Sequence, residues 1–321
     1  MNNSLKILIG VFILLLAGVL LFTRSLYDSP GGGLFKFNVK NASVLVIRGK
    51  GEVLVLKKKE NVWRITNKGW APAEESQVER ALKSILDFSG QDVVSRNREK
   101  QAVYQVIPEL GTTVLFSSGS SLETNNGFIV GKLSQDYMNS YVRKLGSSLT
   151  LKEKGFLQGQ FPANPDSWVK HRVFNSSPDY IMTRVLMSNF SFTSNPSKLV
   201  LERKGLQDGW NISYPIHSET GHQAINGYLQ DMKYLRLMDY LSETNHAFGR
   251  TGQFFKAPAG IMKLEYANGY RETLVIGSDP TNGHYYCEIS GRKDVFMVDR
   301  TQLANLVKKV TDLTQGKGSR K

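Results

Sequence analysis

The sequence contains a single cysteine, Cys287, and only five histidines among 321 residues. One cysteine excludes an intramolecular disulfide and any zinc site built from cysteines. Cys287 falls in an alternating apolar run, which predicts a buried strand position for it and not a reactive thiol. His217 and His222 lie near the start of a predicted helix, where capping or surface roles are expected. The sequence therefore predicts no metal site.

The motifs of several common enzyme classes are also missing. The chain has no Gly-x-Ser-x-Gly elbow, no Walker A sequence, no dinucleotide glycine fingerprint and no His-Glu-x-x-His helix. Ser167-Trp168-Val169-Lys170 fits the short Ser-x-x-Lys pattern of penicillin-recognising enzymes, but no Lys-Thr-Gly element accompanies it. The sequence predicts a protein that is not an enzyme, with no catalytic, cofactor-binding or metal-binding residues and no cofactor. A hydrolase that uses Ser167 and Lys170 is kept as the least favoured of three functional hypotheses; the other two are given at the end of this section.

Acidic residues are few relative to basic ones, 28 Asp and Glu against 41 Lys and Arg, which gives a net charge of +13. Such a balance favours anionic partners, namely lipid headgroups, acidic envelope polymers or nucleic acid, although a solvated basic surface is the simpler explanation. The tryptophans lie in apolar strands and not among the basic residues, which argues against nucleic acid. The basic clusters are Lys57-Lys58-Lys59 at a predicted hairpin turn, Arg96 with Arg98 and Lys100, Lys152 with Lys154, and the C-terminal tail.

The chain has one long apolar run, Ile7 to Phe22. As a helix it would rise about 24 Å, slightly less than the ~30 Å hydrocarbon core of a bilayer, and Lys6 and Arg24 can snorkel at its ends. A cleaved signal peptide is the alternative, but the bulky and charged residues after the run offer no cleavage site. We expect an uncleaved signal anchor in the inner (cytoplasmic) membrane, single-pass, with the bulk of the chain extracytoplasmic on the periplasmic side. The flanking charges do not settle this orientation.

The stretch from Leu54 to Ser95 has a second copy from Leu199 to Ser242. Each copy contains an apolar strand, a polar turn and a tryptophan, and Trp63 and Trp210 are 147 positions apart. The apolar positions that follow recur at i, i+3, i+4, i+7 and i+10, the spacing of one face of an amphipathic helix. The offset pairs Val78 with Ile225, Ala81 with Tyr228, Leu82 with Leu229, Ile85 with Met232, and Phe88 with Leu235.

We therefore predict an α+β fold in which an N-terminal single transmembrane helix precedes two tandem repeats. Each repeat has a β-hairpin, one amphipathic helix and an antiparallel β-meander. In the meander the offset is 146 or 145, so that Phe128-Ile129-Val130-Gly131 matches Leu274-Val275-Ile276-Gly277 and Tyr141-Val142 matches Tyr286-Cys287. The predicted divisions are a membrane anchor at 1–24, a flexible Gly/Pro spacer at 25–42, the first repeat at 43–160, a linker at 161–178, the second repeat at 179–314 and a basic tail at 315–321.

This duplicated pattern behind an N-terminal anchor resembles a bacterial family, the domain of unknown function 4340 proteins. The resemblance spans roughly Val44 to Val310 and rests on the apolar positions together with Trp63, Trp210, Gly131 and Gly277. It implies a membrane-anchored extracytoplasmic protein, of a kind often encoded beside ABC-type transporter and gliding-associated subunits. It supplies no catalytic residues.

The chain departs from the family pattern before each meander. Family members usually place a Gly-Leu-Asp-x-Pro-like segment there, whereas this chain has Val106-Ile107-Pro108-Glu109-Leu110 and Ala257-Pro258-Ala259-Gly260. The leading hypothesis is a non-catalytic, membrane-tethered accessory protein whose repeated sheets make protein–protein contacts, with ABC-type transporter subunits as expected partners. The alternative is a binding module for an anionic envelope polymer or lipid headgroup.

Overall fold

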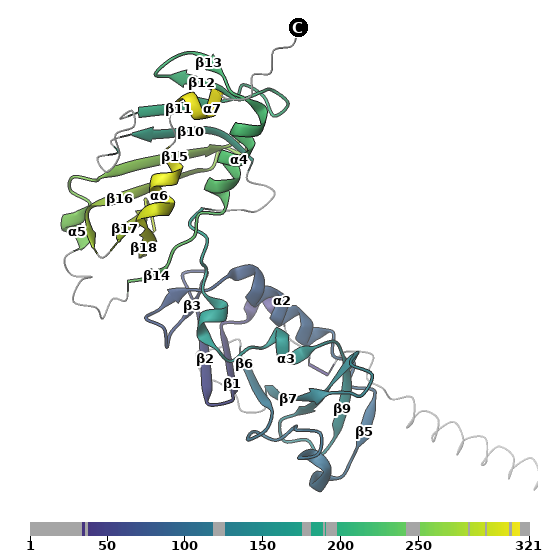
Figure 1. Cartoon of the computed structure of the whole chain (residues 1–321). Coiled ribbons are helices and arrows are strands. Elements are labelled where there is room, and N and C mark those ends of the chain that lie inside the picture. Colours follow the sequence, from purple (N-terminus) through teal and green to yellow (C-terminus); the bar gives the residue numbers. More distant parts are fainter. Residues whose placement is uncertain are drawn as a thin grey trace, which may run out of the picture. The chain divides into compact units, whose positions relative to one another are not determined.

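The computed structural model describes residues 34–35, 38–117, 126–174, 181–188, 190, 198–241, 251–281, 283–292, 294–307 and 310–314. The chain divides into two compact units (Figure 1). One takes the described residues up to Trp63 together with Glu75–Ser167, and the other takes Arg64–Glu74 together with the described residues from Trp168 onward.

The first sheet has nine antiparallel strands in the order β4-β3-β2-β1-β6-β7-β8-β9-β5. Strand β1 pairs with both β2 and β6, so the N-terminal hairpin and the later meander are parts of one sheet. The elements are η1 (Val39–Asn41), β1 (Val44–Gly49), β2 (Glu52–Lys59), β3 (Val62–Ile65), β4 (Ala71–Pro72), α2 (Glu75–Leu86), β5 (Val93–Ser95), η2 (Arg98–Gln101), β6 (Thr112–Ser117), β7 (Gly127–Leu133), β8 (Asn139–Lys144), β9 (Thr150–Lys154), α3 (Leu157–Gln160) and η3 (Pro165–Trp168).

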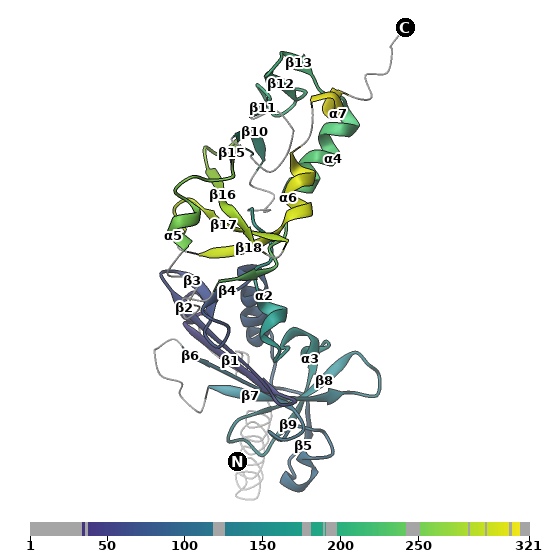
Figure 2. The same cartoon turned by 60° about the vertical axis from the view of Figure 1, so that its left-hand side comes forward.

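Helix α2 covers one face of the first sheet (Figure 2). Its apolar residues recur at helical spacing, and Val78, Leu82 and Ile85 are at most 1% exposed. Glu75 in the first turn lies at the positive end of the helix dipole. Beyond the helix, Phe128 of β7 packs against Phe88 with ring centroids 5.0 Å apart. This aromatic contact extends the core past the end of the helix.

The second sheet has nine antiparallel strands in the order β13-β12-β11-β10-β15-β16-β17-β18-β14. Its central strand β10 pairs with both β11 and β15, as β1 does with β2 and β6. The elements are β10 (Met182–Ser188), β11 (Lys198–Glu202), β12 (Asn211–Tyr214), β13 (Ser218–Glu219), α4 (His222–Lys233), β14 (Asp239–Tyr240), α5 (Thr251–Phe254), β15 (Gly260–Tyr266), β16 (Arg271–Thr281), β17 (His284–Ile289), β18 (Val295–Asp299), α6 (Arg300–Leu306) and α7 (Val310–Thr314).

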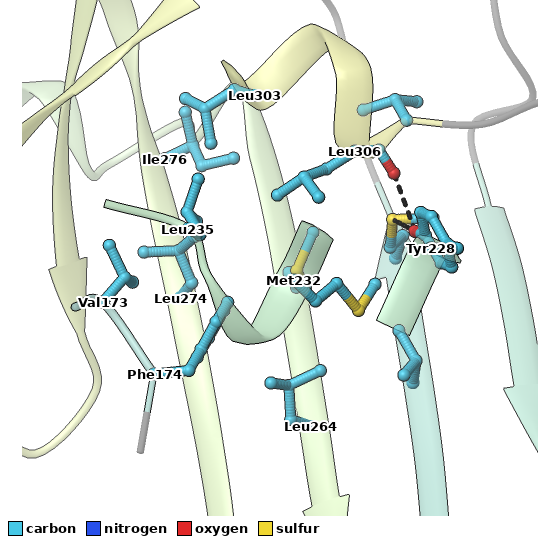
Figure 3. Packing of buried hydrophobic residues seen from close by; sticks show 14 of the residues in the cluster. Val173, Phe174, Tyr228, Met232, Leu235, Leu264, Leu274, Ile276, Leu303 and Leu306 are labelled. Carbon is cyan, nitrogen blue, oxygen red and sulfur yellow. Dashed lines mark hydrogen bonds between the residues drawn. The ribbon is translucent and has the colours of Figure 1, made fainter. Parts of the chain in front are cut away.

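The core of the second unit lies between its sheet and helices α4 and α6 (Figure 3). Met232 of α4 and Leu264 and Leu274 of the sheet are at most 1% exposed. The Tyr228 hydroxyl donates to the carbonyl of Leu306 at 2.7 Å and so ties α4 to α6. A buried hydroxyl needs such a partner, because an unpaired one would cost the full desolvation penalty.

Cys287 lies in β17 and is fully buried, as the sequence predicted. Burial raises the pKa of its thiol well above the ordinary value. The reactive form of cysteine is the thiolate, which this buried position disfavours.

The two units repeat each other element by element. Both bounds of α2 shift by 147 positions to give the bounds of α4. Both bounds of β8 and of β9 shift by 145 positions to give those of β17 and β18. The two sheets therefore have the same strand order at the same places in the sequence.

The predicted α+β fold class is wrong, because the protein is mostly β. The sequence pattern predicted a separate hairpin, helix and meander in each copy. In the structure the β1–β6 and β10–β15 pairings join hairpin and meander into one continuous sheet. Two-residue strands at the sheet edges, such as β4 and β13, extend it further and are too short to show an alternating pattern.

The predicted single-pass membrane location is also corrected. No helix in the described ranges is long and apolar enough to cross a membrane. Residues 1–24, on which the predicted anchor fell, lie outside the described residues. The structure therefore supports neither a signal anchor, nor an inner-membrane location, nor an extracytoplasmic position for the bulk of the chain.

We expect Gly227→Ala to raise the free energy of unfolding of the second unit by about 1 kcal/mol, the difference in helix propensity between the two residues. Gly227 lies inside α4 on its exposed side, and an added Cβ would meet nothing within 4 Å. The equivalent position of α2 is Arg80, an ordinary helix former. Urea denaturation of both proteins measures the change.

Gly269→Ala is the matched control for that substitution. A Cβ at Gly269 would also meet nothing within 4 Å, but the residue has φ 80, where a side chain is strained. We expect this variant to lose about 1 kcal/mol. Both sites have room for a Cβ and differ only in backbone conformation. Equal changes in the free energy of unfolding for the two variants would therefore contradict this prediction.

Candidate functional site

Ser167 and Lys170, the residues of the hydrolase hypothesis, lie in a short helical turn and the segment that follows it. Ser167 is exposed in η3, and the Lys170 amide donates to the carbonyl of Pro72 at 3.0 Å. His217 is exposed before β13, and His222 is the first residue of α4. In the described ranges, no group of three or more His, Cys, Asp or Glu side chains could hold a metal ion. That the protein is not an enzyme stays a prediction.

The two tryptophans that mark the repeat are buried, and the lysine cluster belongs to a strand. Trp63 is 3% exposed and Trp210 is 7% exposed, so both are core residues. Lys57-Lys58-Lys59 continues strand β2 and does not form the predicted turn. The turn comes one residue later, where Glu60 and Asn61 have φ 51 and 63.

An exposed apolar cluster lies at the hairpin between β7 and β8 in the first unit. Tyr137 and Met138 form its tip and are 79% and 74% exposed, more than any other large hydrophobic residue described. Phe156 is 55% exposed and follows Gly155, whose amide donates to the Met138 carbonyl at 2.8 Å. We call Tyr137, Met138 and Phe156 the tip patch. Exposed apolar groups that are clustered and not single are typical of interaction sites.

Hydrogen bonds centred on Asp136 hold the hairpin turn. The carboxylate accepts from the Ser134 hydroxyl at 2.5 Å and from the Met138 amide at 2.8 Å. It also accepts from the Asn139 side chain at 3.1 Å. The Ser134 amide in turn donates to the Asn139 carbonyl at 2.9 Å and closes the turn. The bonds from Ser134 and then Met138 lower the pKa of the Asp136 carboxyl below its ordinary value.

The backbone of Tyr137 is in the left-handed region, with φ 57. Glycine, asparagine or aspartate is the usual residue there, and a bulky side chain costs about 1 kcal/mol or more. An aromatic residue that is both exposed and strained adds nothing to the core. Strain of this kind is concentrated at functional sites.

The second unit provides an internal comparison for the tip patch. The offset of 145 that relates β8 to β17 and β9 to β18 places Asn282, Gly283 and Thr301 at the three equivalent positions. All three are small or polar, and Gly283 has φ 82, a conformation that glycine adopts without strain. The fold therefore forms this hairpin without apolar residues at its tip.

The sequence analysis missed this site. The hairpin after β7 contains neither glycine nor proline, the residues that most strongly mark a turn in a sequence. The offset of 145, already found for Tyr141-Val142 and Tyr286-Cys287, was the available signal. Applied to the residues just before Tyr141, the same offset aligns Tyr137 and Met138 with Asn282 and Gly283. Asn-Gly is the strongest short signal for a hairpin turn.

The chain matches the family described as Domain of unknown function (DUF4340) over residues 63–251. No curated protein and no solved structure matches the chain. The matched range covers more than half of the chain, from Trp63 in β3 through α4 and the residues that follow. The chain belongs to the DUF4340 family.

Proposed function

We propose that this chain is a non-catalytic accessory protein that binds a partner protein through the tip patch. The observation that carries the proposal is the difference between the two copies of the fold at one position. The first copy presents Tyr137 and Met138 in a strained, hydrogen-bonded turn, and the second copy has Asn282 and Gly283 there. The apolar residues cost stability that the fold does not require, so an interaction is the consistent reason for them.

The rigidity of the turn supports this role. Binding through a flexible loop loses affinity, because the loop must be ordered in the complex. The Asp136 hydrogen bonds fix the backbone before any partner arrives. Aromatic residues and methionine are also enriched in interface cores. The family resemblance suggests subunits of an ABC-type transporter as first candidates for the partner.

The alternative, binding to an anionic envelope polymer or lipid headgroup, is motivated by the net charge of +13. Such binding would depend on lysine and arginine and would leave three large apolar side chains in water. The tip patch therefore favours a protein partner.

The test compares three forms of the tagged full chain, each recovered by affinity purification from detergent-treated, cross-linked cells. These forms are the wild type, Tyr137→Asn with Met138→Ser, and the control Leu206→Ser. Asparagine tolerates the left-handed turn, so the double variant keeps the fold, which thermal unfolding checks. Leu206 is 48% exposed in the hairpin between β11 and β12 of the other unit.

We expect the double variant to lose at least one protein that the wild type and Leu206→Ser both recover. Mass spectrometry of the recovered proteins measures the loss. Recovery of the same proteins in equal amounts by all three forms would contradict the proposal, because the tip patch would then contribute no binding energy.

A further inference from the structure

Basic side chains flank the tip patch in the first unit. Lys154 of β9 pairs across the sheet with Asn139, the residue that follows Met138. Lys132 lies near the end of β7, on the strand that leads into the turn. Both side chains are exposed. One exposed lysine therefore lies on β7, a strand of the hairpin itself, and the other on β9, the strand that pairs with β8.

These two lysines carry free positive charge. In the described parts of the chain, neither Lys132 nor Lys154 makes an ion pair. The neighbouring Lys152 is different, because it pairs with Asp92 at 3.2 Å. Lys152 and Lys154 form one basic cluster in the sequence, but only Lys152 has an acidic partner in the described parts of the chain.

Asp136 is the one acidic residue of the turn, and it reduces the positive charge of the two lysines without cancelling it. The Asp136 carboxylate accepts hydrogen bonds from the Ser134 hydroxyl, the Met138 amide and the Asn139 side chain. These donors are neutral and lower the pKa of the carboxyl, so Asp136 stays negatively charged while it holds the turn. The rim of the tip patch, defined as Lys132 and Lys154, is positive.

The second copy shows that the fold does not require this rim. The offset of 145 places Asp299 at the position of Lys154. Asp299 caps helix α6, since its carboxylate accepts from the amides of Thr301 and Gln302 at 2.8 and 3.1 Å. The charge at this position is therefore opposite in the two copies. The hairpin tip differs in the same way, since it is apolar only in the first copy.

We infer that the partner protein presents an apolar pocket bordered by carboxylate side chains, which receives the tip patch and faces the rim. This inference rests on the proposed function. Apolar side chains at the centre of an interface supply binding energy, whereas charges around them increase the association rate and select the partner. A positive rim excludes basic partners, because like charges at an interface are repulsive.

The test places the photo-reactive residue p-benzoylphenylalanine at position 137 of the full chain and measures the yield of cross-linked partner in cells. In this background, Lys132→Glu with Lys154→Glu reverses the rim. Lys57→Glu with Lys100→Glu is the matched control, because both lysines are exposed in the same unit and the change in net charge is the same. We expect the rim variant to lower the yield about tenfold and the control to change it little.

The outcomes separate this inference from the proposed function. Equal yields from the rim variant and the control, with a clear adduct in both, would overturn the acidic border and leave the tip patch as a binding site. Absence of any protein adduct at position 137 would overturn both. Retention on an anionic polymer column that the rim variant reduces and the Tyr137→Asn with Met138→Ser variant does not would overturn both in favour of polymer binding.

Discussion

Glu272→Ala is expected to lower the free energy of unfolding of the second unit by about 3 kcal/mol. Glu272 is a carboxylate inside the core, 2% exposed, on strand β16. It accepts a hydrogen bond from the Tyr266 hydroxyl at 2.7 Å and forms an ion pair with Arg292. Alanine would remove the carboxylate that accepts from the buried Tyr266 hydroxyl and balances the charge of the partly buried Arg292 guanidinium, and so would leave part of their desolvation uncompensated. Urea denaturation followed by circular dichroism measures the loss.

Glu265→Ala is the control for that prediction. Glu265 lies between Arg184 and Arg271 at 3.6 Å from each, and its side chain is 32% exposed. Water screens such pairs, so we expect a loss of about 1 kcal/mol or less. If Glu265→Ala and Glu272→Ala lowered the free energy of unfolding by similar amounts, burial of the carboxylate would not be what determines the size of the loss.

Replacing both partners distinguishes the contribution of the ion pair from the contribution of the volume that its side chains fill. In Glu272→Leu with Arg292→Met, no charge is left buried without a counterion. Apolar replacements of buried ion pairs are often neutral or stabilising. We therefore expect the double variant to be more stable than Glu272→Ala. If it were less stable, the pair itself, and not the avoidance of an unpaired charge, would be what stabilises the core.

The sequence predicted the two long helices, α2 and α4, because their signal is local. Apolar residues at helical spacing marked α2 from Val78 onward, and the offset of 147 carried the prediction to α4. The sheets were harder, since strand pairing joins residues far apart in the chain. Val46 pairs with Leu115, for example, and no local pattern records that contact. This is why hairpin and meander were predicted as separate parts of an α+β fold.

The candidate site was less predictable than the fold. Exposure of Tyr137 and Met138 depends on where the hairpin ends, and the strain at Tyr137 depends on its φ of 57. Phe156 joins them through a backbone hydrogen bond from Gly155 to Met138. The buried Glu272 was equally hidden, because its partner Arg292 is on another segment and the first copy has Asn126 at the equivalent position.

Gly131→Ala is expected to lower the free energy of unfolding of the first unit by about 3 kcal/mol. A Cβ at Gly131 would lie 2.2 Å from the carbonyl oxygen of Tyr104 and 2.8 Å from Val106 Cγ1. The segment that contains Tyr104 is fixed against β7, because its carbonyl accepts from the Lys132 amide at 3.2 Å. Backbone cannot move aside as a flexible side chain can. Chemical denaturation measures the loss, and Gly209→Ala, where an added Cβ meets nothing within 4 Å, is the control.

Gly277→Ala extends the test to the second copy. Gly277 is the equivalent strand residue, and its nearest obstacles are Phe254 Cβ at 3.0 Å and the Tyr286 carbonyl oxygen at 3.1 Å. The wider spacing predicts a smaller loss, about 1 kcal/mol. A larger loss at Gly277 than at Gly131 would contradict the steric explanation. Both copies thus use glycine at the same position inside a strand because another segment packs against the sheet there. This packing gives a physical reason for the Val130-Gly131 and Ile276-Gly277 pairs, whose glycines contribute to the family resemblance.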